Sequence, residues 1–174
     1  GFSAILYSAK KGYYTNLTTI INTSWGSELY SDLENDVILV ATESYDAIIV
    51  ASAGNGQNSF QINAPTYPAS YESVISVAPL GVNDTWNNWA NYHHTIDISA
   101  PGENIISTII NNQYGNFTGS SQSSPIVASS IGLLATLHPE YQPEQLIRMI
   151  IETANPNIYQ INPQEYLQGN LGYG

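Results

Sequence analysis

The order of apolar and polar residues along the chain predicts alternating helices and short strands. Residues 1–11 carry small and apolar side chains at helical spacing, and Gly12 is expected to end that helix. A β-branched run at 19–22 predicts a strand. A second helix is expected from about Ser31 to Ser44. Its core-facing side is expected to carry Leu33, Val37, Ile38, Val40 and Ala41.

Two later segments are apolar without interruption. Residues 47–51 form one of them and end at an Asn-Gly turn, and residues 74–78 form the other. Continuous apolarity is typical of a strand that is covered on both faces, as in a parallel sheet. The strand-helix-strand order therefore favours an α/β fold. Further short strands are expected at 96–98 and 105–108.

Two helices are expected in the last third of the chain. One runs from near Ser121 to about Leu137, and Pro125 is expected in its first turn or so, because a proline further inside a helix removes a hydrogen bond. The other begins at Pro143 and stops before residue 155. Its core-facing residues are expected to be Leu146, Ile147, Ile150 and Ile151. The polar segments 56–72 and 111–119 are expected to be loops.

Composition excludes several classes of function. The 174 residues include 3 Lys and Arg against 14 Asp and Glu, a net charge of -11, which argues against nucleic acid or an anionic membrane as partner. No apolar run approaches the roughly 18 residues of a membrane span. The absence of cysteine removes thiol nucleophiles and thiolate metal sites. No group of His, Asp and Glu has metal-ligand spacing, so neither a metal nor a cofactor is expected.

Three segments have the residue types of a catalytic site. Ser121 lies where a serine-rich stretch enters a helix, beside unpaired backbone N–H groups that can hold an oxyanion; the alternative is a plain N-cap. Asn55 follows a buried strand, where α/β sheets bind ligands; the alternative is an Asn-Gly turn. Residues 22–26 are either an edge for an extended peptide or a strand end with a core tryptophan.

Taken in order, these segments resemble the subtilisin-like serine peptidases. The resemblance rests on Asn-Thr-Ser-Trp-Gly at 22–26, Ala-Ser-Ala-Gly-Asn-Gly at 51–56, Tyr-Pro-Ala at 67–69, Ser-Ala-Pro-Gly at 99–102 and Gly-Ser-Ser-Gln-Ser-Ser-Pro at 119–125. It implies a three-layer α/β fold with a mainly parallel sheet. It also implies a secreted endopeptidase that cleaves peptide or protein substrates, with Ser121 as nucleophile and Asn55 as oxyanion donor.

The resemblance also implies where a substrate binds. Ser24, Trp25 and Gly26 would pair with its backbone, and Ala51, Ala53 and Gly54 would line the pocket for the side chain before the scissile bond. Tyr67-Pro68 matches the family's cis-proline turn beside that pocket. The chain departs from the usual Gly-Thr-Ser-Met-Ala at Ser120, Gln122 and Ser123. Some relatives bind a weak cation through main-chain carbonyls near this turn, but main-chain ligands leave no sequence pattern, so no calcium site is predicted.

Two of the family's motifs are missing. No Asp is followed by Ser/Thr-Gly and no His by Gly-Thr, and none of His93, His94 and His138 is expected to be the base. We therefore expect 1–174 to be a partial catalytic domain, incomplete at both ends, inactive alone and dependent on a preceding part of its own domain. Apolar surface is then expected near Ile20 and residues 48–50. The alternatives are an inactive peptide-binding pseudopeptidase and a structural α/β domain without a cleft.

Overall fold

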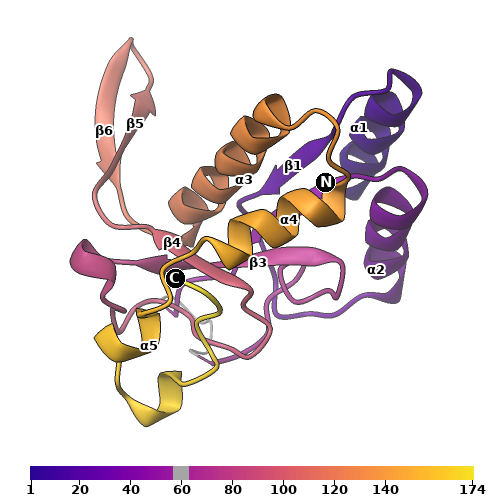
Figure 1. The fold of residues 1–174 in the computed structure, drawn as a ribbon. Helices are drawn as coiled ribbons and strands as arrows, with labels where there is room; N and C mark the ends of the chain where they lie inside the picture. Colours follow the sequence, from indigo (N-terminus) through magenta and orange to yellow (C-terminus); the bar gives the residue numbers. More distant parts are fainter. Residues whose placement is uncertain (57–62) are drawn as a thin grey trace.

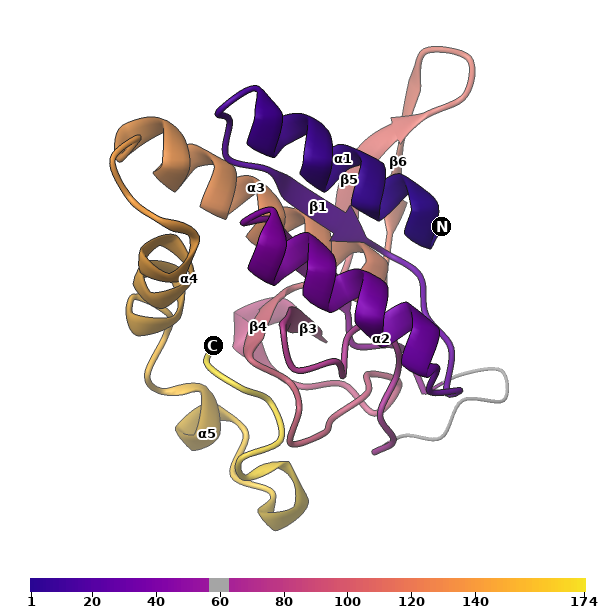
Figure 2. The same ribbon diagram turned by 90° about the vertical axis from the view of Figure 1, so that its right-hand side faces the viewer.

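A four-stranded parallel sheet lies between two pairs of helices (Figures 1 and 2). The computed structural model describes residues 1–56 and 63–174. The strands follow one another across the sheet in chain order: β1 (Ile20–Thr23), β2 (Ile48–Ser52), β3 (Val74–Leu80) and β4 (Ile98–Pro101). The four main helices are α1 (Phe2–Tyr14), α2 (Asp32–Leu39), α3 (Ser120–Leu137) and α4 (Pro143–Glu152). The predicted three-layer α/β arrangement with a parallel sheet is thus confirmed.

The two central strands explain why their sequences are apolar throughout. Every residue of β2 and β3 is buried, and successive side chains of a strand point to opposite faces. Ile49 and Val74 pack in the core under α1 and α2, whereas Ile48 and Val50 pack in the core under α3 and α4. Of the residues near which apolar surface is expected, residues 48–50 are themselves buried, because β1 pairs alongside β2 and helices cover both faces, whereas Ile20 on β1 is part-exposed.

Helix α1 does not end at Gly12 but continues to Tyr14. Gly12 is buried, and a Cβ atom built on it would collide with Oγ1 of Thr19, which leads into β1. The glycine therefore serves a close approach of the returning chain rather than a helix stop. The chain leaves the helix three residues later, where the N–H groups of Thr15 and Leu17 donate to the Gly12 carbonyl.

Helix α2 begins where predicted but faces the core differently. Ser31 is its N-cap, and its Oγ accepts from the N–H of Glu34. Leu33, expected to face inward, is 74% exposed, because it lies about 140° around the helix from the buried Ile38 at 3.6 residues per turn. Val40 is exposed as well; there the helix widens into a π-helical segment, Val40–Ser44, that breaks the regular period.

An antiparallel hairpin extends from the body of the molecule beside α3 (Figure 1). Its strands are β5 (Ile105–Ile109) and β6 (Gln113–Phe117), so the expectation of a loop at 111–119 is wrong. Most of β6 is exposed, and an exposed ribbon carries the polar residues that also typify loops. The strand expected at 96–98 is also displaced: β4 starts at Ile98, after the turn that buries Ile96.

Short elements complete the C-terminal part. They are the helix α5 (Ile158–Ile161) and the 3₁₀ turn Glu165–Leu167; a further 3₁₀ turn, Val82–Asp84, follows β3. Ile158 and Leu167 form a separate small core with Leu171 and with Leu80 at the end of β3. Tyr173 then pairs in parallel with Ile98 at the edge of β4. Among the described residues, no helix is long and apolar enough to cross a membrane.

We predict opposite effects for two glycine-to-alanine substitutions in helices. Gly12→Ala forces a methyl group against Thr19 and the Leu17 carbonyl and should lower the free energy of unfolding by about 1–3 kcal/mol. Gly132→Ala in α3 places its methyl group in ordinary contact with Ile20 and should raise stability by up to about 1 kcal/mol, the helix propensity difference. Urea denaturation of both variants measures this. Equal changes in the free energy of unfolding for the two variants would contradict the close approach at Gly12.

We predict a pH-dependent effect for Asp97→Asn. Burial raises the pKa of the Asp97 carboxyl above its ordinary value, although the Ser76 N–H donates to Oδ2 (2.8 Å) and opposes the rise. A raised pKa means that the folded state favours the neutral acid, so its stabilising contribution is lost as the pH rises through that pKa. The asparagine variant should match the wild type below the ordinary aspartate range and exceed its stability at neutral pH. Urea midpoints of both proteins, measured from below the ordinary aspartate range to neutral pH, test this prediction. A difference in stability that does not change with pH would contradict it.

Candidate active site

The start of α3 lies at the edge of the sheet where the parallel strands end. The Gly119 N–H donates to the carbonyl of Gly102, which follows β4 (2.8 Å). The N–H of Gly54, which follows β2, donates to Ser120 Oγ (3.2 Å). Ser24, which follows β1, contacts Ser121. Three segments that are distant in the sequence therefore meet at one helix terminus.

Ser121 and Ser24 form a reciprocal pair of hydrogen bonds. Ser121 Oγ donates to the Ser24 carbonyl (3.3 Å), and Ser24 Oγ donates to the Ser121 carbonyl (3.0 Å). Pro125 lies inside α3, in its second turn rather than in the first turn as expected. In a regular helix the N–H of residue 125 would donate to the carbonyl of residue 121. Proline has no N–H, so the Ser24 hydroxyl supplies the missing donor and the proline is tolerated.

Asn55 lies against the same helix terminus. Its Oδ1 accepts from the Ser120 N–H (2.9 Å), one of the donors that a helix start leaves unpaired. This bond fixes which end of the amide is oxygen and turns Nδ2 toward Gly119. A Cβ atom on Gly119 would lie 3.0 Å from Nδ2, and Gly119 has a φ of +152°. Only glycine leaves the space in front of the Asn55 amide open.

Two buried polar residues hold the segment that carries Asn55. Asn91 Nδ2 donates to the carbonyls of Ala53 (2.7 Å) and Ala64 (2.9 Å), and its Oδ1 accepts from the N–H of Asn63 (2.8 Å). Thr66 Oγ1 also donates to Ala53 (2.8 Å). Sequence reasoning missed both Asn91 and Thr66, because in a chain so rich in Asn and Thr no local pattern distinguishes a buried residue from an exposed one.

The serines behind Ser121 each have a partner. Ser123 Oγ donates to the Pro101 carbonyl (3.0 Å), and Ser124 Oγ donates to Asn22 Oδ1 (2.6 Å). Asn22 Nδ2 in turn donates to Ser24 Oγ (2.9 Å). The polar departure at Ser123 is therefore matched by the carbonyl of the last residue of β4.

The other predicted substrate-binding residues divide into exposed and buried. Trp25 is 42% exposed, with its ring edge-to-face with Phe2 (5.1 Å between centroids), and Gly26 is exposed close to the Tyr67 carbonyl. Ser24 and Gly54 are part-exposed and Ala53 is buried. Ala51 is 0% exposed and packs in the core under α1 and α2. The prediction that Ala51 and Ala53 line a pocket is therefore wrong, because Ala51 points to the face of β2 that α1 and α2 cover and Ala53 packs against Ala78 and Ile96.

The peptide bond between Tyr67 and Pro68 is cis, as predicted. Tyr67 pairs in antiparallel fashion with Ser27, with N–H donors in both directions (2.7 and 2.9 Å). The turn is thereby attached to the chain that follows Ser24, Trp25 and Gly26.

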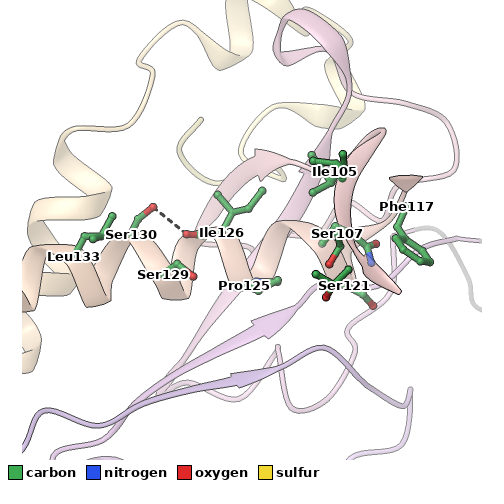
Figure 3. A pocket seen from close by; sticks show the side chains of 12 residues that line it. Ile105, Ser107, Phe117, Ser121, Pro125, Ile126, Ser129, Ser130 and Leu133 are labelled. Carbon is green, nitrogen blue, oxygen red and sulfur yellow. Dashed lines mark hydrogen bonds between the residues drawn. The ribbon is translucent and has the colours of Figure 1, made fainter. Parts of the chain in front are cut away.

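A cavity of about 610 Å³ opens between α3 and the β5–β6 hairpin (Figure 3). Ser121 lies at one end of it and Leu133 further along α3. Apolar side chains form much of its wall: Ile105, Ile106, Phe117, Pro125, Ile126 and Leu133. Ile106 and Leu133 are each 68% exposed, so this wall presents apolar surface to solvent. The cavity reaches Ser121 from the hairpin side rather than from between residues 24 and 54.

The three histidines have other surroundings. His138 follows the last residue of α3, about 25 Å along the helix from Ser121, and stacks on Tyr141. His93 Nδ1 shares a hydrogen bond with Thr95 Oγ1 (2.9 Å), and burial together with neighbouring His94 lowers the pKa of His93. In the described part of the chain, no three His, Asp or Glu side chains gather as a metal site would require.

Comparisons with known proteins agree with this geometry. Residues 3–174 match the model of the Subtilase family of peptidases. The chain is 37% identical over 134 residues to a thermophilic serine proteinase of Bacillus sp. (strain AK1), covering 76% of this chain and 31% of that protein. It is 35% identical over 107 residues to the major intracellular serine protease of Bacillus subtilis (strain 168), covering 61% and 32%.

Solved structures show the same fold. Sphericase superposes with a TM-score of 0.77 at 27% identity, covering 88% of this chain and 54% of that one. The chain thus spans about a third of its curated relatives and about half of this structural neighbour. With the family model matching nearly its whole length, the chain belongs to the subtilase family, whose fold it shares over the part that it spans.

Proposed function

We propose that this chain carries the nucleophile and the oxyanion site of a serine endopeptidase that hydrolyses peptide bonds through an acyl-enzyme on Ser121. The observation that carries the proposal is the meeting of the Ser121 hydroxyl and the Asn55 amide at the first turn of α3. Attack of Ser121 Oγ on a peptide carbonyl places negative charge on the carbonyl oxygen. Donors already aimed at that position stabilise the charge without rearranging.

Two kinds of donor serve this oxyanion. The Asn55 Nδ2 group faces the open side at Gly119, and its Oδ1 bond to Ser120 keeps it there. The N–H of Ser121, in the first turn of α3, has no carbonyl one turn earlier in the helix to accept it. Acyl transfer to a serine in such a site uses no cofactor, and we propose none.

The substrate is proposed to be an extended peptide or protein segment. Ser24, Trp25 and Gly26 leave β1 with exposed backbone next to Ser121, and an extended peptide can add there as a further strand. Ala53 and Gly54 lead from β2 to Asn55 on the other side of Ser121. A strand bound at residues 24–26 would present its carbonyl to both the nucleophile and the amide.

We propose that the general base and its carboxylate come from outside residues 1–174. A serine nucleophile needs a base within hydrogen-bonding reach, but here the Ser121 hydroxyl donates to a main-chain carbonyl and each histidine lies in another environment. The apolar cavity leading to Ser121 is the approach we assign to a segment that carries this base. On this proposal, 1–174 is part of a larger catalytic domain.

A peptide-binding pseudopeptidase is the second candidate. The bond from Ser121 Oγ to the Ser24 carbonyl favours it, because a hydroxyl in that bond is not activated.

Secretion is proposed as well, supported by the family's extracellular members, such as the halolysin-like protease Nep of Natrialba magadii. Another relative is named an intracellular protease, so membership of the family does not by itself determine location.

We predict that the purified 174-residue chain does not cleave peptides. On this proposal the chain has no base, and in subtilisin the loss of the serine or the histidine costs about as much as the loss of the whole triad, roughly 10⁶ in kcat. A fluorogenic peptide library incubated with the wild-type chain and with Ser121→Ala should give the same signal. Turnover that disappears in the Ser121→Ala variant would show that a base lies within these residues.

We predict a separate effect for Asn55 in a chain extended upstream to include a triad histidine. Asn55→Ala should reduce kcat by about 10²–10³, the loss known for an oxyanion donor in subtilisin, with little change in KM. Asn88→Ala, which alters an exposed asparagine, is the control and should leave both unchanged. An Asn55→Ala variant with full kcat would remove Asn55 from the site, and an extended chain without any turnover would favour the pseudopeptidase.

A further inference from the structure

Asn55 is followed by Gly56, and an asparagine that precedes a glycine can lose its side-chain amide. Glycine has no side chain to keep its backbone nitrogen away from the preceding side-chain amide. Once deprotonated, the Gly56 nitrogen can attack Asn55 Cγ and close a five-membered succinimide, while the Cγ–Nδ2 bond breaks and ammonia leaves. Water then opens the ring to an aspartyl or isoaspartyl residue. The net change is amide plus water to acid plus ammonia. No other Asn-Gly pair occurs in the sequence.

The fold holds the attacking atom of this reaction. The Gly56 N–H donates to the Trp89 carbonyl at 2.7 Å, and Asn55 forms an antiparallel bridge with Ala90. A nitrogen whose proton is held in a short hydrogen bond is neither free to lose it nor free to turn toward Cγ. The nucleophile is therefore restrained as long as residues 54–56 and 89–91 stay paired.

The attacked carbon, Asn55 Cγ, is activated by its surroundings rather than restrained. The Ser120 N–H donates to Asn55 Oδ1, and a donor on a carbonyl oxygen draws electron density from its carbon. The positive end of the α3 dipole lies at the same place and favours a carboxylate product. The electrophile is thus activated, and the pairing of residues 54–56 with residues 89–91 opposes ring closure.

We propose that Asn55–Gly56 is a latent deamidation site, kept intact by the pairing of Gly56 with Trp89 and converted to a carboxylate when that pairing opens. Opening of this kind is a local event with its own free energy, well below that of global unfolding. The product lacks the Nδ2 donor, so the site would lose its oxyanion amide permanently. That consequence rests on the proposed function, whereas the deamidation does not.

The side chain of Asn91 stabilises this pairing. It joins Ala53 and Ala64 to the segment 89–91 that holds Gly56, and it is 97% buried. Asn91→Ala removes these bonds and should speed loss of the Asn55 amide about tenfold, the effect of weakening a buried polar contact by about 1.4 kcal/mol. Asn162→Ala is the matched control, since Asn162 is equally buried and hydrogen-bonded to Asp84, Trp86 and Ile158, whereas among the described residues none of its hydrogen bonds reaches residues 53–56 or 89–91.

The test is peptide mapping by mass spectrometry of the 174-residue chain during incubation at mildly alkaline pH, with isoaspartate detected separately. We expect slow conversion of Asn55 in the native chain, fast conversion in urea, and an increased native rate in Asn91→Ala but not in Asn162→Ala. Gly56→Ala should suppress conversion in urea. Because the readout is a mass change, it stands whether or not the chain is a peptidase.

Hydrogen exchange of the Gly56 amide provides a second measurement in the wild type, which does not depend on how well Asn91→Ala folds. We expect exchange much slower than in an unstructured peptide. Exchange at the unstructured rate, equal conversion in native and urea-treated chains, or a folded Asn91→Ala variant no faster than Asn162→Ala would each overturn the proposal.

Discussion

The hydrogen bond from the Ser120 N–H to Asn55 Oδ1 ties the start of α3 to the end of β2, and the candidate site depends on it. It satisfies a donor that every helix start leaves unpaired, and it orients an amide that could otherwise turn either way. The bond between Gly54 and Ser120 Oγ reinforces the same junction. Because α3 packs across the sheet, this junction sets where Ser121 lies relative to every strand end.

Much of this arrangement could be predicted because it follows from strong, local signals. Uninterrupted apolar runs identify β2 and β3, since a strand covered on both faces has no polar side. Pro143 marks the start of α4 at the predicted residue. The placement of Ser121 and Asn55 could be predicted because Ser121 lies at the start of a helix and Asn55 lies just after a strand. Parallel strands end at a common edge, where such residues meet.

What could not be predicted depends on contacts between distant segments. Gly12 has the sequence signature of a helix stop, yet its role comes from Thr19, which returns past the helix. Leu33 is apolar and periodic but is largely exposed, and only the three-dimensional packing of α2 reveals this. The β5–β6 hairpin has a polar second strand that composition cannot distinguish from a loop. The Asn91 side chain bonds to main-chain atoms of other residues, and main-chain partners leave no pattern in the amino-acid sequence.

The proline in the second turn of α3 has a mechanical consequence. By withholding an N–H from the Ser121 carbonyl, Pro125 leaves that carbonyl to the Ser24 hydroxyl, so the peptide unit of Ser121 is anchored to the end of β1 as well as to its own helix. Any force that displaces Ser24 therefore acts on both bonds between the two serines. The two bonds link the residue that follows β1 directly to Ser121, so a displacement of Ser24 reaches the Ser121 hydroxyl without passing through the body of the helix.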